Sequence, residues 1–189
     1  MKKASLLTVL VILIICAATQ VQAFDGDRKG FMLNLGAGFG QGKVTVSDSG
    51  VSASLDATGF CTDFKIGAGL SPKTVLYYTN RALWYKPDPL VSAGLGESLV
   101  NGMSAVGVTQ FLNPQAPSPF VSGAIGIGVL TDSDASESET GLGFTVGVGY
   151  EFAKSWIAEA TYMHAKVAEE AGVDLSVSNL AVTISWFAY

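Results

Sequence analysis

The sequence predicts an all-β fold, an eight-stranded antiparallel transmembrane β-barrel, and three observations lead to it. The 189-residue chain is 49% hydrophobic and contains 22 glycines, yet only 14% of its residues are charged. No segment after the first 23 residues holds 18 consecutive apolar residues, which excludes membrane-spanning helices. Apolar residues instead alternate with small or polar ones in segments long enough for tilted membrane strands, which need about 9 to 11 residues.

Residues 1–23 have the features of a secretory signal peptide. Two lysines precede the apolar run LLTVLVILIICAA, and small residues lead up to Ala23. The run is too short for a membrane helix, which needs about 20 residues. A lipidated Cys16 is the alternative, but the bulky Ile15 before it is unsuited to that processing. The sequence therefore predicts a signal peptide over 1–23 and a barrel domain over 24–189.

Composition excludes several classes of function. The formal net charge is −5, and removal of the two leader lysines makes it more negative, which argues against nucleic acid as a partner. Beyond the leader, Cys61 is the only cysteine and His164 the only histidine. Neither an internal disulfide nor a zinc site built from several cysteines and histidines is available, and we expect no metal and no cofactor.

The segment 141–152, GLGFTVGVGYEF, shows the alternation most clearly. Its even positions are all large and apolar, and its odd positions are glycine, threonine and one glutamate. We interpret the apolar face as lipid-facing and the glycine face as the lining of a narrow closed barrel, in which every backbone group is paired. The other seven predicted strands are 30–39, 58–70, 74–85, 99–112, 119–130, 155–166 and 175–189.

The connections between these strands alternate in length. Short turns are predicted at 71–73, 113–118 and 153–154, and longer loops at 41–56, 86–98, 131–140 and 167–174. All the long loops would emerge on one side, as they do in outer-membrane barrels with short periplasmic turns and longer external loops. A β-sandwich gives no reason for such sorting.

The alternation also places charged side chains inside the barrel. A basic residue facing lipid near the midplane costs about 2–4 kcal/mol, so inward positions are favoured. Buried charges need partners, and we expect a network of ion pairs that fills the interior; a gated polar conduit is the alternative. The same alternation leaves Asn80 facing lipid, which is a misfit. The predicted network consists of Asp63, Lys65, Arg81, Glu151 and Glu159.

His164 lies near the predicted outer rim and raises the question of catalysis. A serine, a histidine and an acid at the rim would suit cleavage of a lipid ester, and some eight-stranded barrels are lipid A deacylases. However, His164 shares its parity with Tyr162, which directs it towards lipid or headgroups, and no deacylase motif surrounds it. We interpret it as an interface histidine and predict no catalytic residues. The nearby candidates for a triad are Glu169, Glu170, Ser176 and Ser178.

The loop 131–140 is acidic. Its Asp-x-Asp start at Asp132 is similar to a calcium loop, but Glu137 occupies the position where that turn needs glycine. We interpret the loop as a solvated acidic segment, with weak capture of divalent cations as the alternative.

Three stretches carry a resemblance to a known group. KGFMLNLGAGFG, GFTVGVGYEFAKSWIAEATYM and LAVTISWFAY resemble small bacterial outer-membrane barrels of the OmpA/OmpX-like group. The resemblance implies location in the cell outer membrane of a Gram-negative bacterium. It also implies a C-terminal signal, formed by Trp186, Phe187 and Tyr189, that the barrel-assembly machinery reads. Phe187 and Tyr189 have the opposite parity to Trp186, so either the strand end is bulged or the signal is read loosely.

These observations together predict a monomer in contact with outer-membrane lipids and lipopolysaccharide. Its expected role is structural or interactional, in membrane integrity or in adhesion through external loops, and not enzymatic. The alternatives are a lipid A-modifying esterase that uses the rim histidine and a minor ion-conducting barrel.

Overall fold

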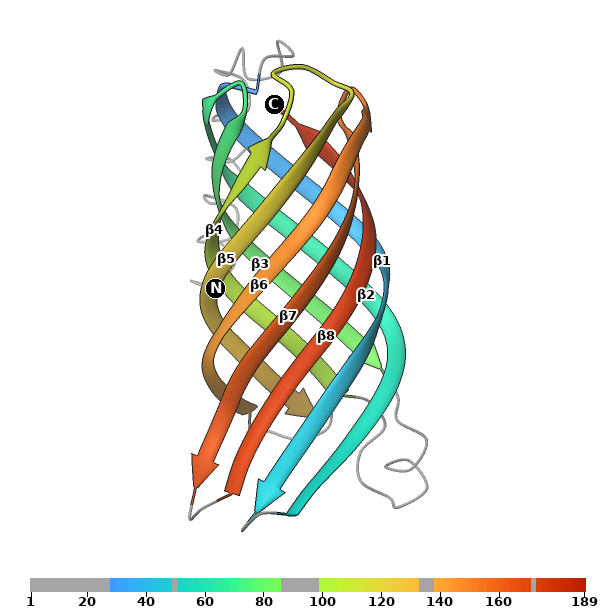
Figure 1. The fold of residues 1–189 in the computed structure, drawn as a ribbon, viewed down its shortest axis with the longest axis vertical. Helices are drawn as coiled ribbons and strands as arrows, with labels where there is room; N and C mark the ends of the chain where they lie inside the picture. The colour runs from blue at the N-terminus through green and yellow to red at the C-terminus, as the bar shows by residue number, and fades with distance from the viewer. Residues whose placement is uncertain (1–27, 49–50, 86–98, 133–137, 171–172) are drawn as a thin grey trace, which may run out of the picture.

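The computed structural model describes residues 28–48, 51–85, 99–132, 138–170 and 173–189, which form a closed antiparallel barrel of eight strands (Figure 1). Each strand pairs with the next in sequence, and β8 closes the sheet by pairing with β1. The predicted fold class is therefore confirmed. The strands are β1 (Gly30–Asp48), β2 (Val51–Ser71), β3 (Thr74–Tyr85), β4 (Leu99–Phe111), β5 (Ser118–Asp132), β6 (Ser138–Ala153), β7 (Trp156–Glu170) and β8 (Val173–Ala188).

Two of the predicted long loops are wrong, because the strands continue through them. β1 and β2 stay in register from Gln41 opposite Thr58 to Asp48 opposite Val51, across most of the predicted loop 41–56. β7 and β8 likewise extend through most of 167–174. The segment 41–56 contains Val44, Thr45, Val46 and Val51, and such β-branched residues favour extended backbone. Residues 86–98, the centre of 131–140 and the predicted signal peptide lie outside the described residues.

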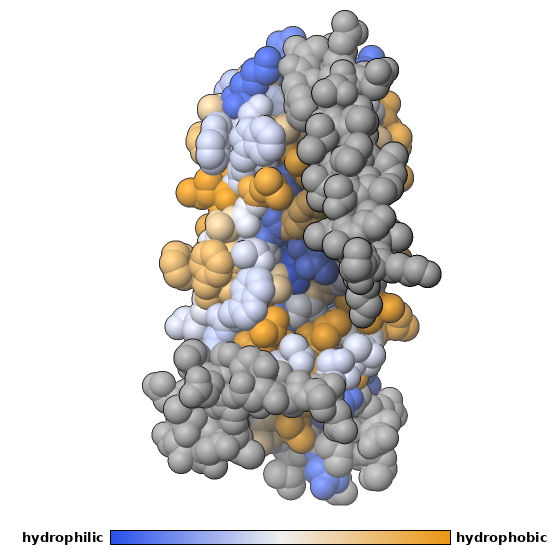
Figure 2. All heavy atoms as spheres, turned by 180° about the vertical axis from the view of Figure 1, so that it is seen from behind, coloured by the Kyte–Doolittle hydropathy of each residue, from blue (hydrophilic) through white to orange (hydrophobic). Residues whose placement is uncertain are grey.

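The outer wall carries a broad apolar belt (Figure 2). The predicted lipid-facing positions of 141–152 all point outwards, from Leu142, which is 81% exposed, to Phe152. Phe39 on β1 and Ile125 on β5 are similarly exposed. Side chains this apolar and this exposed suit a hydrocarbon solvent and not water. No helix long and apolar enough to cross a membrane occurs in the described part of the chain.

The interior is narrow, and glycine is needed where neighbouring strands crowd it. A Cβ atom at Gly38 would collide with the carbonyl oxygen of Val182 on β8. A Cβ at Gly149 would collide with the ring of Phe120, which lies over this glycine. The inward glycines thus make room both for the curvature of the sheet and for large side chains opposite them.

The strands extend to different lengths at the two ends of the barrel. The C-terminus lies at the same end as the short β2–β3, β4–β5 and β6–β7 connections (Figure 1). At the opposite end the β1–β2 and β7–β8 hairpins project farthest. We call these the turn end and the hairpin end.

Candidate functional site: two buried ion-pair clusters in the barrel interior

Four of the five predicted interior charges meet in the middle of the barrel. Asp63 and Lys65 come from β2, Arg81 from β3 and Glu159 from β7. They share the inward parity of their strands, and Asp63 stands directly opposite Arg81 in the register. Strands β2 and β3 are neighbours, whereas β7 faces them from across the lumen. We call these four residues the central cluster.

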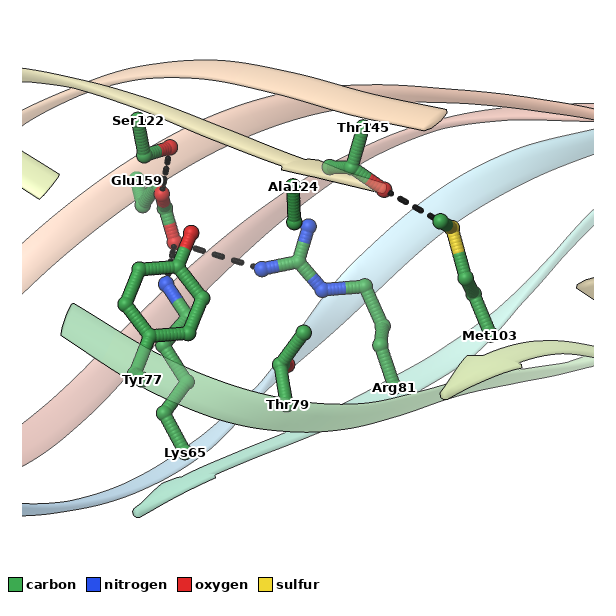
Figure 3. Close-up of a pocket in the computed structure, with 9 residues that line it drawn as sticks. All are labelled: Lys65, Tyr77, Thr79, Arg81, Met103, Ser122, Ala124, Thr145 and Glu159. Carbon is green, nitrogen blue, oxygen red and sulfur yellow. Dashed lines mark hydrogen bonds and ion pairs between the residues drawn. The ribbon is translucent and has the colours of Figure 1, made fainter. Parts of the chain in front are cut away.

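The central cluster is closely paired and buried, and Figure 3 shows three of its members, Lys65, Arg81 and Glu159. Lys65 Nζ lies 2.6 Å from Glu159 Oε2, and Arg81 Nη2 lies 2.8 Å from Asp63 Oδ2. Arg81 also reaches Glu159 at 3.2 Å, and Lys65 reaches Asp63 at 3.4 Å. All four side chains are at most 5% exposed. Each acid therefore contacts both bases, which is the arrangement that buried charges require.

Neutral groups complete the hydrogen bonding of the two acids. The Ser122 hydroxyl donates to Glu159 Oε1 at 2.6 Å, and the Thr79 hydroxyl donates to Asp63 Oδ1 at 3.2 Å. Lys65 lies over the ring of Tyr77, with Nζ 5.2 Å from its centroid. A cavity of only about 10 Å³ remains beside the cluster, which is about the space of one water molecule.

Glu151 belongs to a different group, and the prediction that it joins the same network is wrong. Its carboxylate pairs with Arg28, just before β1, and accepts a hydrogen bond from the Tyr189 hydroxyl at 2.6 Å. Burial and this carboxylate raise the pKa of the Tyr189 phenol, which therefore remains a donor. We call Arg28, Glu151 and Tyr189 the basal cluster.

Arg28 binds the turn end of the barrel from inside. Its guanidinium donates to the carbonyl oxygens of Asn113 at 2.8 Å and Pro72 at 3.1 Å, which belong to two different turns. It also stacks over the Phe111 ring, 3.9 Å from the centroid. One side chain thus connects the β2–β3 turn, the β4–β5 turn and β6.

Sequence reasoning missed Arg28, although a signal was present. The predicted interior set held three acids but only two bases, and a buried carboxylate without a partner is costly. Arg28 precedes β1, and alternation along a strand gives no direction for a side chain outside the strand.

β8 pairs with β1 up to Ala188 without a register shift, so the strand end is not bulged. Trp186 faces outwards at 39% exposure, whereas Phe187 and Tyr189 are buried inside. The Phe187 ring packs against Phe111 at 5.8 Å and against Tyr189 at 5.1 Å between centroids. The two parities therefore reflect two sides of one regular strand. Recognition of these residues by the assembly machinery stays a prediction.

Asn80 faces outwards, as its parity predicts. Its side-chain amide donates to the Ser104 hydroxyl of β4 at 2.9 Å. This pairing satisfies part of the hydrogen-bonding capacity that would otherwise face lipid.

His164 lies on the outer wall, half-buried, and stands directly opposite Ser178 in the β7–β8 register. Its ring packs against Phe144 at 6.0 Å between centroids. Within the described residues, no carboxylate hydrogen-bonds to His164, and no group of three or more acidic, histidine or cysteine side chains is arranged to hold a metal. The side chains of Glu169, Glu170 and Asp132 lie outside the described set.

A closed eight-stranded barrel with an apolar outer belt and a filled, charged interior is the architecture of small outer-membrane barrels. Among solved structures, the chain resembles Ail, the attachment invasion locus protein of Yersinia pestis, with a TM-score of 0.52 and 14% identity over 83% of this chain and 99% of that one. It also resembles Neisserial surface protein A, with a TM-score of 0.50 and 17% identity over 83% of this chain and 96% of that one. At these identities the likeness shows the fold. No protein-family model and no curated protein matches the chain.

Proposed function

We propose that the protein is a surface-interaction barrel of a Gram-negative outer membrane, with a structural or adhesive role carried by its projecting hairpins. The observation that carries the proposal is the extension of β1–β2 and β7–β8 beyond the apolar belt. On β1 the outward side chains are apolar up to Phe39 and polar from Gln41 onwards. At about 3.4 Å per residue, the segment 41–48 is roughly 25 Å long measured along the strand.

The projecting β1–β2 hairpin has the character of a contact surface. Ser52, Ala53 and Ser54 are exposed. Val46 has the parity that points inwards lower on β1, yet here its side chain is 41% exposed. A paired hairpin holds such groups in a fixed geometry and loses less entropy on binding than a flexible loop. The names of the two matched barrels, one an attachment protein and one a surface protein, agree with this role. At 14% and 17% sequence identity, however, they do not support it.

The interior argues against the ion-conducting alternative. Both clusters are charge-balanced and buried, and the cavity at the central cluster is too small for a hydrated ion. Passage would require four short ion contacts to separate in a buried environment.

The esterase alternative has one observation in its favour, the placement of Ser178 directly opposite His164. A triad needs a serine hydrogen-bonded to the histidine and an acid that orients it. Neither hydrogen bond is found among the described residues, so we rank the esterase second.

The test is to shorten the β1–β2 hairpin. Residues 45–54 are replaced by Asn-Gly, a two-residue turn that joins Val44 to Leu55, which already stand opposite each other. We expect cells producing the trimmed protein to lose adhesion to epithelial monolayers, because the contact surface is gone while the membrane-spanning part is unchanged.

The control for folding is the migration of heated and unheated protein in gels, which should differ for both forms. Unchanged adhesion after trimming contradicts the proposal. Release of acyl chains from lipid A by the purified protein, abolished by His164→Ala, would establish the esterase instead.

A further inference from the structure

The outer wall of β7, β8, β1 and β2 changes chemistry in successive rows of the register. One row is apolar throughout and contains Ala160, Val182, Phe39 and Phe60. The next row towards the hairpin end contains Tyr162, Leu180, Gln41 and Thr58, and the one after it contains His164, Ser178, Lys43 and Asp56. Four neighbouring strands thus pass from hydrocarbon-compatible to polar groups within two rows.

A groove lies across this transition. It is a shallow, open groove of about 330 Å³, lined at its apolar side by Tyr162 and Leu180, and at its polar side by Gln41, Lys43, Asp56 and Ser178. The Leu180 side chain is 58% exposed and the Tyr162 side chain 41%. The groove therefore offers acyl contacts and headgroup contacts side by side.

The two charged side chains of the groove are available to a ligand. Lys43 and Asp56 stand directly opposite each other on β1 and β2, yet neither forms an ion pair with any other described residue. Both are exposed. By contrast, the neighbouring Lys166 is already engaged with Asp174 at 3.6 Å.

We propose that this groove binds the phosphorylated sugar headgroup of a glycolipid. Lys43 contacts the phosphate, while Asp56 accepts hydrogen bonds from sugar hydroxyls and Ser178 and Gln41 supply further polar contacts. Leu180 and Tyr162 contact the first part of the acyl chains. The inference rests on the proposed membrane location, because only in a bilayer do the apolar rows meet acyl chains.

Asp56 is what distinguishes a glycolipid from an ordinary anionic phospholipid. A carboxylate beside the lysine repels a headgroup that presents only phosphate, but it suits a headgroup with hydroxyl donors next to the phosphate. Repulsion between the Asp56 carboxylate and such a phosphate changes which ligand is preferred more than it changes the strength of binding.

The experiment uses the full chain, expressed and purified from membranes in detergent, with lipid binding measured by native mass spectrometry. The probes are bisphosphorylated lipopolysaccharide, the same lipid after phosphatase treatment, and phosphatidic acid, whose headgroup is phosphate alone. We expect the phosphorylated glycolipid to bind best and Lys43→Ala to weaken it about tenfold, the change that 1.4 kcal/mol represents. Asp56→Ala should reduce binding of the glycolipid and increase binding of phosphatidic acid.

Lys73→Ala is the matched control, because Lys73 is an exposed lysine of the β2–β3 turn at the opposite end of the barrel. It should leave all three affinities unchanged. The proposal is overturned if Lys43→Ala binds as the unaltered protein does, if phosphatase treatment has no effect, or if phosphatidic acid competes equally. This assay does not involve the hairpin tip, so its failure would leave the adhesive role untouched, and loss of adhesion on trimming would not prove the groove.

Discussion

The central and basal clusters use the same chemistry but are assembled in different ways. In the central cluster, all four charged side chains belong to strands, and each acid contacts both bases. In the basal cluster, one carboxylate pairs with one base, and two of the three members lie outside the strands: Arg28 precedes β1 and Tyr189 follows β8. The first cluster is therefore fixed by the sheet register, whereas the second fastens the chain ends to the finished barrel.

This difference predicts how much each cluster contributes to stability. A buried charge that loses its partner costs about 3–5 kcal/mol. The central cluster lies in the middle of the barrel interior, and removal of one acid affects two bases. The basal cluster lies at the turn end, where Glu151 keeps the Tyr189 hydroxyl as a donor even without Arg28.

The largest expected effect is that of Glu159→Gln. The change removes the acid nearest to Lys65 and leaves two buried bases to share Asp63, so the free energy of unfolding should fall by about 3–5 kcal/mol. Urea unfolding of the barrel in lipid vesicles measures the loss. Glu139→Gln, at an exposed position of β6, is the matched control and should change stability by less than about 0.5 kcal/mol.

Arg28→Met should have a smaller effect, a loss of about 1–3 kcal/mol. Methionine keeps much of the contact with the Phe111 ring but leaves the carboxylate of Glu151 without its cation. The same urea titration measures it. If this variant were less stable than Glu159→Gln, the basal cluster would be the principal one and the comparison would be reversed.

The smallest expected effect is the coupling between the two clusters. No hydrogen bond or ion pair joins them among the described residues, so Glu159→Gln and Arg28→Met should add within about 0.5 kcal/mol in the double variant. Arg28→Met and Glu151→Gln, by contrast, remove the same ion pair and should be clearly non-additive. A coupling above 1 kcal/mol between the two clusters would show that they form one network, as the sequence first suggested.

Alternation along the chain was enough to predict the barrel and the inward direction of all four members of the central cluster. A side chain in a strand points to one of two faces, so a single glycine-lined face in 141–152 gives the direction of Glu151, and the same reasoning applies to Lys65, Arg81 and Glu159. The apolar solvent on the other face makes the choice of direction energetically strong. The same rule did not assign a direction to the C-terminal aromatic residues. Trp186 faces outwards and Phe187 faces inwards, so aromatic residues end both faces of β8.

Parity gives the face of a side chain but not its partner, and the partners were decided by the tertiary structure. Glu151 and Glu159 have the same direction on neighbouring strands, yet one meets Arg28 and the other meets Lys65 and Arg81. The height of each charge in the lumen depends on the stagger and closure of all eight strands, which no single segment encodes. Arg28 lies outside any strand. Only closure of the barrel brings it into contact with the β2–β3 and β4–β5 turns, with Glu151 on β6 and with the ring of Tyr189. The groove on the outer wall has the same origin, since β1 meets β8 only when the two ends of the sheet join.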